Sequence, residues 1–294
     1  MSVLEEIEQA IKSLRGGPGA SVVGVGQQWG VGSGVVVAKG HVLTNAHNVR
    51  HEAVEVTFAD GRTAEGRVAG IDVDGDIAVL SVETADVPAV AWAGAHPEIG
   101  DAVFAISNPG GRGVRVSFGF VSGTERRFRG PRGRQITGSI EHTAPLLPGS
   151  SGGPVVDKNG ALLGINTNRL GEGFYLSIPA DETLRGRVDA LSRGESAEPP
   201  RLGIGIAPAH VAKGLRRAVG LPDTDGLLVR FVEDGSPAEG AGIAEGDLIT
   251  EAGGRNLTSA DELHDALTKA GRGASIELKV VRGTSERVVA ISLN

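Results

Sequence analysis

The sequence PGSSGGP, at Pro148–Pro154, decides the fold of this chain. Glycines flank a pair of serines and a proline closes the run, which predicts a tight backbone turn. Because glycine has no Cβ, the carbonyl group of another chain can approach the main chain closely there. The amides of Gly149 and Ser151 can then point into one concavity, with the Ser151 hydroxyl at its mouth. The turn therefore predicts a serine nucleophile beside an oxyanion hole.

Two upstream segments carry the groups that such a serine needs. A serine hydroxyl is a poor nucleophile unless a base lies beside it and a third group orients that base. The segment TNAH ends at His47 after a predicted strand, and the segment GDIAVL carries Asp76 into another strand. His142 lies nine residues before Ser151 and is the rival base, but it lacks a comparable strand-to-turn pattern. We therefore expect His47 and Asp76 to serve Ser151.

Three of these patterns have competing interpretations. The serine turn has the composition of a flexible linker, but the apolar PVV that follows it favours a strand. The glycines at 30–34 resemble part of a dinucleotide fingerprint, but a strand-like VVVA follows them instead of a helix. The acidic spacing of a calcium loop is found at Asp72, Asp74, Asp76 and Glu83. Its sixth position is Ile77 where such a loop needs glycine, so calcium is the less favoured reading.

The three segments, in the order His, Asp, Ser, resemble the trypsin-like serine proteases of the HtrA (Deg) family. The resemblance runs from about residue 20 to the end of the chain. It implies a mostly β fold, with two six-stranded antiparallel β-barrels of the chymotrypsin-like kind followed by an α+β PDZ domain. It also implies roles for each residue: Ser151 as nucleophile, His47 as general base and acid, Asp76 as the group that fixes the imidazole tautomer, and Gly149 and Ser151 as oxyanion-hole amides. We expect no cofactor and no metal.

The same resemblance assigns a pocket for the residue before the scissile bond. The residues that would line it are Leu146, Asn166, Thr167 and Asn168. None carries a negative charge that would attract lysine or arginine, so we expect cleavage after small or medium aliphatic residues. Many relatives have Thr-Asp-Ala-Ala-Ile-Asn where this chain has HTAPLL, at 142–147. The missing aspartate and the added proline bear on how this activation loop moves.

The sequence divides into four segments. These are an N-terminal helix and glycine-rich linker at 1–19, a protease domain at 20–193, a linker at 194–200 and a PDZ domain at 201–294. The first helix, at 2–14, has an apolar stripe of Leu4, Ile7, Ile11 and Leu14. The stripe can pack on its own barrel or on a neighbouring subunit. We favour the neighbour, and with it a homotrimer.

The PDZ segment carries two local patterns for peptide binding. Leu202, Gly203 and Ile204 match the loop whose backbone amides receive the C-terminal carboxylate of a peptide. A capping box at 259–262 opens a helix that carries Leu263 and Leu267. In the family this helix walls the peptide groove, although both leucines also suit a core.

Composition sets the class of protein. The chain has 294 residues, 40% of them hydrophobic, which is enough for two globular domains. A net charge of −7 argues against a nucleic-acid partner, and the absence of cysteine excludes disulfides and thiol catalysis. No apolar run is long enough to span a membrane. The arginine-rich stretch Arg126–Arg134 is expected to be a solvated loop, with an acidic partner as the alternative.

These observations give two candidate functions. The favoured one is a serine endopeptidase that cleaves unfolded or damaged proteins in quality control, with C-terminal or extended peptides bound by the PDZ domain. The alternative is a catalytically weak adaptor or chaperone that works through the PDZ groove. The N-terminus lacks a signal-peptide pattern, so the sequence as it stands predicts a cytoplasmic protein, or an extracytoplasmic one if a leader was removed.

Overall fold

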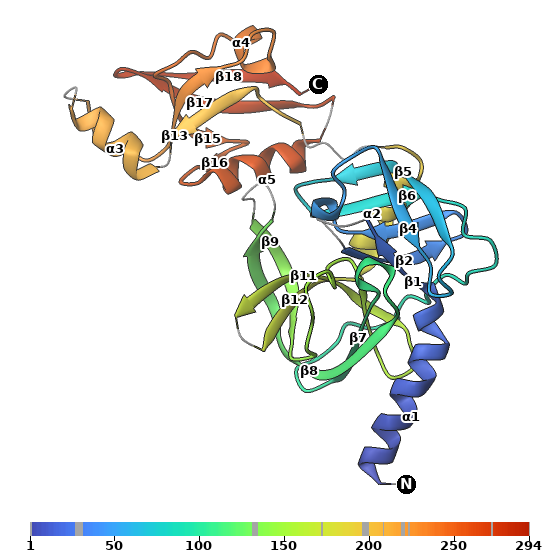
Figure 1. Cartoon of the computed structure of the whole chain (residues 1–294). Coiled ribbons are helices and arrows are strands. Elements are labelled where there is room, and N and C mark those ends of the chain that lie inside the picture. Colours follow the sequence, from blue (N-terminus) through green and yellow to red (C-terminus); the bar gives the residue numbers. More distant parts are fainter. Residues whose placement is uncertain are drawn as a thin grey trace. The chain divides into compact units, whose positions relative to one another are not determined.

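Short valine-rich strands separated by glycine turns form two barrels in the computed structural model (Figure 1). The structure describes residues 2–26, 32–130, 135–171, 173–195, 200–207, 209–218, 221–222, 224–271 and 273–293. Contacts divide the chain into two units, residues 1–197 and 198–294. Within the described ranges, no helix is both long enough and apolar enough to cross a membrane.

The first barrel closes in the strand order β1-β2-β3-β6-β5-β4. Its strands are β1 (Val22–Val25), β2 (Gly32–Ala38), β3 (His41–Thr44), β4 (Ala53–Thr57), β5 (Thr63–Asp72) and β6 (Ile77–Ser81). All pairs are antiparallel, and β1 pairs with β4 to complete the ring, so no strand edge is left open. β-Branched residues such as Val23, Val36 and Val42 fill the interior.

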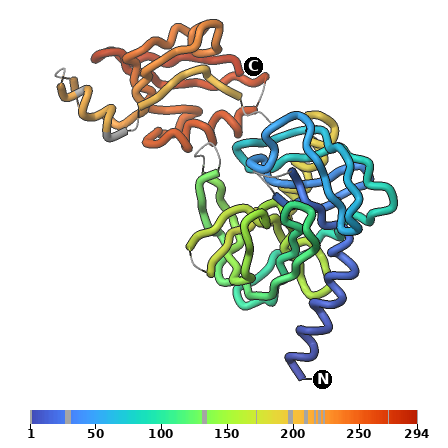
Figure 2. The backbone as a smooth tube through the Cα atoms, viewed as in Figure 1, coloured from blue at the N-terminus to red at the C-terminus, as the bar shows by residue number. Residues whose placement is uncertain are grey.

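The second barrel repeats the plan in the order β10-β11-β12-β9-β8-β7. Its strands are β7 (Ala102–Ser107), β8 (Arg115–Arg129), β9 (Gln135–His142), β10 (Pro154–Val156), β11 (Leu162–Gly171) and β12 (Phe174–Pro179). β10 pairs with β7 and closes it. The predicted pair of six-stranded antiparallel barrels is therefore confirmed, and Figure 2 traces the backbone through both.

The junction between the barrels is a shared apolar core. Val35 and Leu43 of the first barrel contact the same buried cluster as Ile165 and Leu176 of the second. Helix α2 (Glu182–Ser192), capped by the side chain of Asp181, adds its own buried residues Leu184, Val188 and Leu191. Burying one apolar core between the barrels holds their facing strand ends together.

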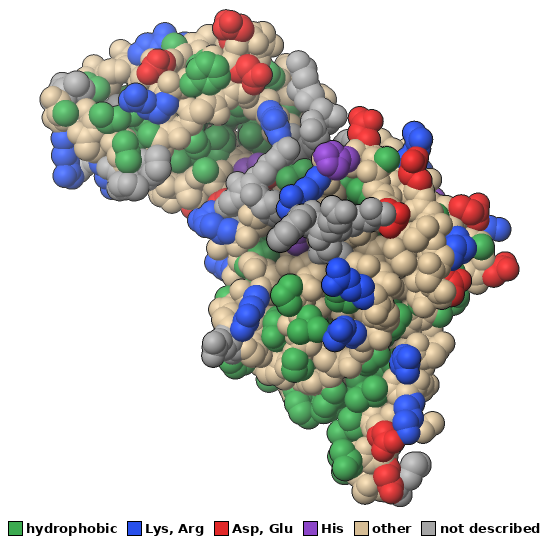
Figure 3. Space-filling model, viewed as in Figure 1, with side chains coloured by type: hydrophobic (Ala, Val, Ile, Leu, Met, Phe, Trp, Pro, Cys, Tyr) green, Lys and Arg blue, Asp and Glu red, His purple; other side chains and the backbone are tan. Residues whose placement is uncertain are grey.

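Helix α1 (Val3–Gly16) begins with a capping box between Ser2 and Glu5. Its C-terminal half packs on the second barrel: Leu14 is 2% exposed and joins Phe104 in one cluster, with Ile11 against it. Its N-terminal half does not, because Leu4 is 75% exposed. The predicted stripe is thus divided between the chain's own core and open surface. On the face viewed in Figure 3, hydrophobic side chains line α1 and the adjoining barrel surface.

The first part of the arginine-rich stretch, residues 126–129, is strand. Arg126, Arg127 and Arg129 belong to β8, and Arg126 pairs with Glu141 of β9 at 3.2 Å. The expectation of a loop across this stretch is therefore wrong for these three residues, because the β8–β9 hairpin extends to Arg129. The remaining two, Arg132 and Arg134, lie outside the described residues.

The second unit is a sheet with helices, as the PDZ expectation requires. Its strands are β13 (Ile204–Ala207), β14 (Leu227–Val232), β15 (Leu248–Ala252), β16 (Arg255–Asn256), β17 (Ser275–Arg282) and β18 (Ser285–Ser292), in the order β13-β14-β15-β17-β18, with β16 paired to β15. Its helices are α3 (Ala209–Ala218), α4 (Pro237–Gly240) and α5 (Ala260–Ala270). The predicted capping residue Ser259 caps α5, and Ser236 caps α4 in the same way, whereas α3 was not expected.

A buried carboxylate braces this sheet. Asp247 is 0% exposed and accepts hydrogen bonds from Arg282 at 2.6 and 2.8 Å and from Arg287 at 3.2 Å. Burial alone would raise the pKa of Asp247, but the hydrogen bonds from Arg282 and from the Ala244 amide, with the two guanidinium charges, outweigh it and leave the pKa lowered. Because Arg282 and Arg287 lie on β17 and β18, this carboxylate ties both strands to the loop before β15.

Candidate active site

The first barrel holds an imidazole against a carboxylate. β3 ends at Thr44, and the short helical turn η2 (Ala46–Asn48) that follows carries His47. His47 Nδ1 lies 2.9 Å from Asp76 Oδ1 and 3.0 Å from Oδ2, and the His47 amide donates to Oδ1 at 3.2 Å. An ionised carboxylate only accepts, so Nδ1 carries the proton of the neutral ring. Nε2 is left with the lone pair that a general base needs.

Asp76 has an unusual backbone conformation. Its φ is 54°, a left-handed value that aspartate tolerates better than most residues. The Asn45 side chain donates to the Asp76 carbonyl at 2.9 Å and holds the backbone in this turn between β5 and β6. Asp76 as a whole is 1% exposed, and its Oδ2 also accepts from Thr167 Oγ1 at 2.5 Å. Thr167 belongs to β11, so the carboxylate joins the two barrels.

The nucleophile turn of the second barrel is held by the first. The Ser151 carbonyl accepts from the Ser33 amide at 2.8 Å and from Asn48 Nδ2 at 2.9 Å. The Ser151 hydroxyl donates to the Thr167 carbonyl at 3.1 Å. Among the described residues, no hydrogen bond joins this hydroxyl to His47. Ser151 and Asp76 are thus both hydrogen-bonded to Thr167 of β11, which links the nucleophile turn to the histidine–aspartate pair.

The nucleophile turn also carries the two amides that were expected to bind an oxyanion. Within the part of the chain that the structure describes, the amides of Gly149 and Ser151 donate no hydrogen bond, whereas the Gly149 carbonyl accepts from Ser33 Oγ at 2.9 Å. Gly149 has a φ of 86° and Gly152 a φ of 87°. A Cβ on Gly152 would lie 2.0 Å from the Ser33 carbonyl oxygen, so only glycine fits between the barrels there.

The four residues expected to line a specificity pocket occupy different environments. Leu146 is half-buried against the core of the second barrel, and Asn168 is exposed. The Thr167 hydroxyl is occupied by Asp76. Asn166 is 0% exposed, and its side chain is hydrogen-bonded to Gly153 and His142.

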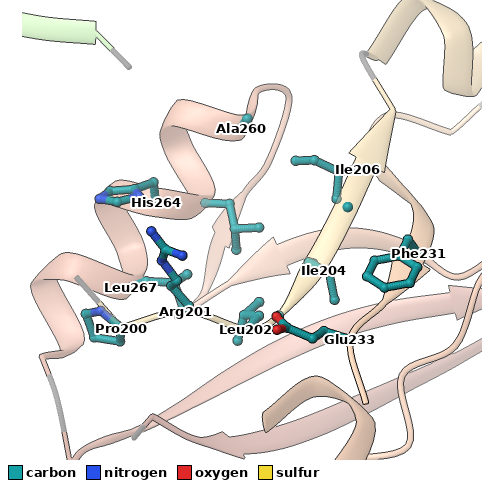
Figure 4. Close-up of a pocket in the computed structure, with 13 residues that line it drawn as sticks. Pro200, Arg201, Leu202, Ile204, Ile206, Phe231, Glu233, Ala260, His264 and Leu267 are labelled. Carbon is teal, nitrogen blue, oxygen red and sulfur yellow. The ribbon is translucent and has the colours of Figure 1, made fainter. Parts of the chain in front are cut away.

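A groove of about 440 Å³ lies between β13 and α5 of the second unit (Figure 4). All five residues expected for peptide binding line it: Leu202, Gly203, Ile204, Leu263 and Leu267. Leu263 and Leu267 are each 5% exposed and also belong to the core of this unit, so the groove and core readings of α5 both hold. Gly203 has a φ of +71°, and a Cβ there would lie 2.3 Å from Ser236 Cβ. The polar side chains of Arg201, Glu233 and His264 also line the groove.

Sequence reasoning missed the residues that hold the site together. Thr167 was expected in a pocket, yet its hydroxyl bonds the carboxylate of the other barrel. Asn45 and Asn48 stand on either side of His47 and bond Asp76 and Ser151. The only pattern that could have marked the asparagines is their position next to His47 in a buried strand-to-turn segment. The contact of Thr167 depends on the packing of two barrels, which no local pattern encodes.

The fold and this constellation define the class: a trypsin-like peptidase unit followed by a PDZ unit. The family model "Trypsin-like peptidase domain" matches residues 32–165, and the model "PDZ domain" matches residues 200–293. Among curated proteins, "Protease Do-like 1, chloroplastic" of Arabidopsis thaliana is 33% identical over 286 residues, covering 90% of this chain and 63% of that relative. "Serine endoprotease DegS" of Escherichia coli (strain K12) is 31% identical over 278 residues, covering 90% of this chain and 76% of that relative.

A solved structure agrees with these sequence matches. "HtrA-type protease AlgW with tripeptide" has a TM-score of 0.68 and 25% sequence identity, covering 97% of this chain and 96% of that one. The chain belongs to the HtrA (Deg) family of trypsin-like serine proteases with a C-terminal PDZ domain. It spans 63% of the length of the Arabidopsis relative.

Proposed function

We propose that this chain is a serine endopeptidase whose nucleophile is Ser151. The observation that carries the proposal is the convergence of Ser151 and Asp76 on one residue of β11. Thr167 binds the Ser151 hydroxyl through its carbonyl at 3.1 Å and the Asp76 carboxylate through its own hydroxyl at 2.5 Å. His47 is fixed to the same carboxylate at 2.9 Å. A base, its orienting group and a serine thus meet beside two unoccupied amides.

The reaction begins when the Ser151 hydroxyl exchanges its bond to Thr167 for one to His47 Nε2. His47 takes the hydroxyl proton as Oγ attacks the substrate carbonyl carbon, and Asp76 stabilises the imidazolium that forms. The amides of Gly149 and Ser151 receive the negative charge that develops on the substrate oxygen. His47 then gives its proton to the leaving amine, and an acyl-enzyme remains. A water molecule then attacks the carbonyl carbon of the acyl-enzyme, with His47 again as the base. The acyl group leaves as an acid, and Ser151 regains its hydroxyl.

The substrates proposed are unfolded or damaged proteins, which present extended segments to Ser151. The groove at β13 and α5 would bind the C-terminus of such a chain, or of another peptide. The unpaired edge of β13 offers main-chain hydrogen bonds, and the loop at Leu202 and Gly203 offers amides for the carboxylate. The AlgW structure, which includes a tripeptide, supports peptide binding by a member of this family.

The hydrogen bond from the Ser151 hydroxyl to Thr167 favours a second candidate. A chain that rests in this arrangement is a weak catalyst and acts as a peptide-binding adaptor or chaperone. The two functions differ in whether binding a peptide in the PDZ groove brings the hydroxyl to His47.

A fluorophosphonate probe separates these candidates, because it labels only a serine that is already activated. We expect labelling of the wild type at Ser151, faster in the presence of a C-terminal peptide, and none in Ser151→Ala. Casein should be cleaved by the wild type alone. A wild type that neither labels nor cleaves, with and without peptide, but still protects unfolded protein from aggregation would support the adaptor.

A further inference from the structure

His142, at the end of β9, is buried behind the nucleophile turn and takes no part in the mechanism above. It is 0% exposed, and its ring stacks on that of Tyr175 of β12, with centroids 5.9 Å apart and an interplanar angle of 26°. Its Nε2 lies 2.9 Å from Asn166 Oδ1. Burying a polar ring of this kind is destabilising unless its nitrogens are hydrogen-bonded.

Asn166 connects that ring to the segment that follows Ser151. Its main chain accepts from the Gly152 amide at 2.8 Å and donates to the Gly153 carbonyl at 2.9 Å. Its side-chain Nδ2 donates to the same Gly153 carbonyl at 3.0 Å. Asn166 is therefore hydrogen-bonded to both glycines that follow the nucleophile. The next residue, Thr167, is hydrogen-bonded to Ser151 and Asp76.

The hydrogen-bond partners fix the protonation of His142. The Gly153 carbonyl only accepts, so the nitrogen of the Asn166 amide faces it and Oδ1 faces His142. His142 must then donate through Nε2–H, and Ser177 Oγ donates to the same oxygen at 3.3 Å. His142 Nδ1 is buried and has no hydrogen-bond partner among the described residues. The ring is thus neutral, with its single proton on the nitrogen that orients Asn166.

The surroundings of His142 favour this neutral ring. The groups that face it are Tyr175, Asn166 and Ser177, and none of them is a carboxylate that would stabilise a charged ring. Glu141, its neighbour on β9, is engaged by Ser122 at 2.9 Å and Arg126 at 3.2 Å. Burial lowers the pKa of His142 to about 4, and the hydrogen bond to Asn166 opposes this only in part.

We infer that His142 is a positioning residue for the nucleophile: through Asn166 it holds the main chain at Gly152 and Gly153, and with it the Ser151 hydroxyl and the oxyanion amides. The inference rests on the proposed protease function. Loss of the Nε2–H donor frees the Asn166 side chain to rotate, since only Ser177 remains on its oxygen. The turn that carries Gly149 and Ser151 then loses one of its two hydrogen bonds to the Gly153 carbonyl.

Two substitutions of His142 separate the donor from the shape. His142→Phe keeps a flat ring against Tyr175 but has no N–H, whereas His142→Gln keeps a donor near the position of Nε2. We expect His142→Phe to lower kcat on a peptide substrate by about 10- to 100-fold with KM unchanged, the size expected for sub-ångström to ångström misplacement of a reacting group. His142→Gln should stay close to the wild type. Equal kcat values for His142→Phe and wild type, or equal losses in both variants, would overturn the inference.

A second background tests the route through Asn166. In Asn166→Ala, adding His142→Phe should lower kcat little further, because the two changes remove the same interaction. Additive losses would show that His142 acts by another route. Far-UV circular dichroism and the thermal midpoint of each variant report whether the fold is intact.

The tautomer can be read in the unaltered protein. In 15N NMR spectra of the wild type, His142 should be neutral at pH 5.5 with its proton on Nε2. This measurement needs no variant, so it holds even where a substituted chain does not fold. A proton on Nδ1, or a cationic ring at this pH, would refute the inference. Fluorophosphonate labelling of the wild type distinguishes failure of the His142 inference from failure of the protease proposal. A wild type that is labelled and cleaves its substrate, but has the other His142 tautomer, refutes only the role of His142.

Discussion

At the residue scale, the site depends on a few buried hydrogen bonds that each join distant parts of the chain. The Asp76 carboxylate accepts from His47 within its own barrel and from Thr167 across the interface. Preorganised donors of this kind are effective because they need not reorient as charge develops. The same arrangement makes the site sensitive to single substitutions.

Removing the nucleophile should abolish turnover. If Ser151, His47 and Asp76 act as a unit, Ser151→Ala should lower kcat by about a millionfold, as in other triad enzymes. His47→Ala should cost about as much, and the double variant little more. Casein hydrolysis measures all three, with Ser150→Ala as the matched control next to the nucleophile. Casein degradation by pure Ser151→Ala protein would contradict the assignment.

Cleavage should follow small or medium aliphatic residues. Neither half-buried Leu146 nor the polar residues Asn166, Thr167 and Asn168 offer a carboxylate to a basic side chain. We therefore expect Val, Ala, Ile or Leu immediately before the cleaved bonds in mass spectra of casein fragments. A majority of cuts after lysine or arginine would reject this pocket.

The free energy of unfolding should fall on acidification because of His142. Its pKa is about 4 in the folded chain and 6.5 when exposed, so between these values the unfolded state binds a proton that the folded state does not. Linkage then gives a loss of up to about 1.4 kcal/mol per pH unit, or roughly 3 kcal/mol in total, from pH 6.5 down to about 4. Urea unfolding of wild type and His142→Gln at several pH values tests this. The variant should lack this part of the slope, and parallel curves would contradict the prediction.

At the scale of elements, α1 is two half-helices with different surroundings. Leu14 is 2% exposed against the second barrel, whereas Leu4 is 75% exposed. The helical periodicity of the sequence places Leu4 and Leu14 on one stripe, but it does not determine which turns of the helix pack on the barrel. The contact depends on where β7 and β8 leave room, which only the assembled barrel determines.

A pair of matched substitutions tests this division. Leu14→Ala should lower the free energy of unfolding by about 2–5 kcal/mol, the range for a buried leucine. Leu4→Ala should change it by less than about 0.5 kcal/mol in a monomeric chain, as is usual for exposed sites. Thermal or urea unfolding of both variants gives the comparison. Equal effects would mean that the two leucines share one environment.

At the scale of the whole molecule, much was predictable from sequence. The serine turn and the order of His, Asp and Ser carry the family resemblance, and that resemblance implied the two barrels and the PDZ domain, which are confirmed. The capping box at 259–262 placed the start of α5. The sequence did not predict α3, the strand character of Arg126–Arg129, or the links through Asn45, Asn48 and Thr167. Helix and strand patterns are local, whereas those links form only when separate elements pack.

Assembly of subunits remains a prediction at this scale. The exposed residues Val3 and Leu4, 74% and 75% accessible, are what α1 offers to a neighbour, since Ile11 and Leu14 pack within the chain. We predict a homotrimer that weakens in Val3→Asp/Leu4→Asp, because charges at these positions cannot be buried without a large penalty. Light scattering at micromolar concentration gives the mass. A monomeric wild type rejects the trimer, and a trimer unaffected by the double variant rejects α1 as its contact.

The hydrogen bonds that cross the barrel interface have a consequence for biosynthesis. Ser33 and Asn48 hold the carbonyl of Ser151, and Thr167 holds Asp76, so the two sides of the site are more than 80 residues apart along the chain. When only the first barrel has emerged from the ribosome, the nascent chain has His47 and Asp76 but no Ser151. The chain becomes able to cut only after β11 has emerged and folded against its partner. Nascent copies that lack a folded second barrel therefore carry the base without the serine that it serves.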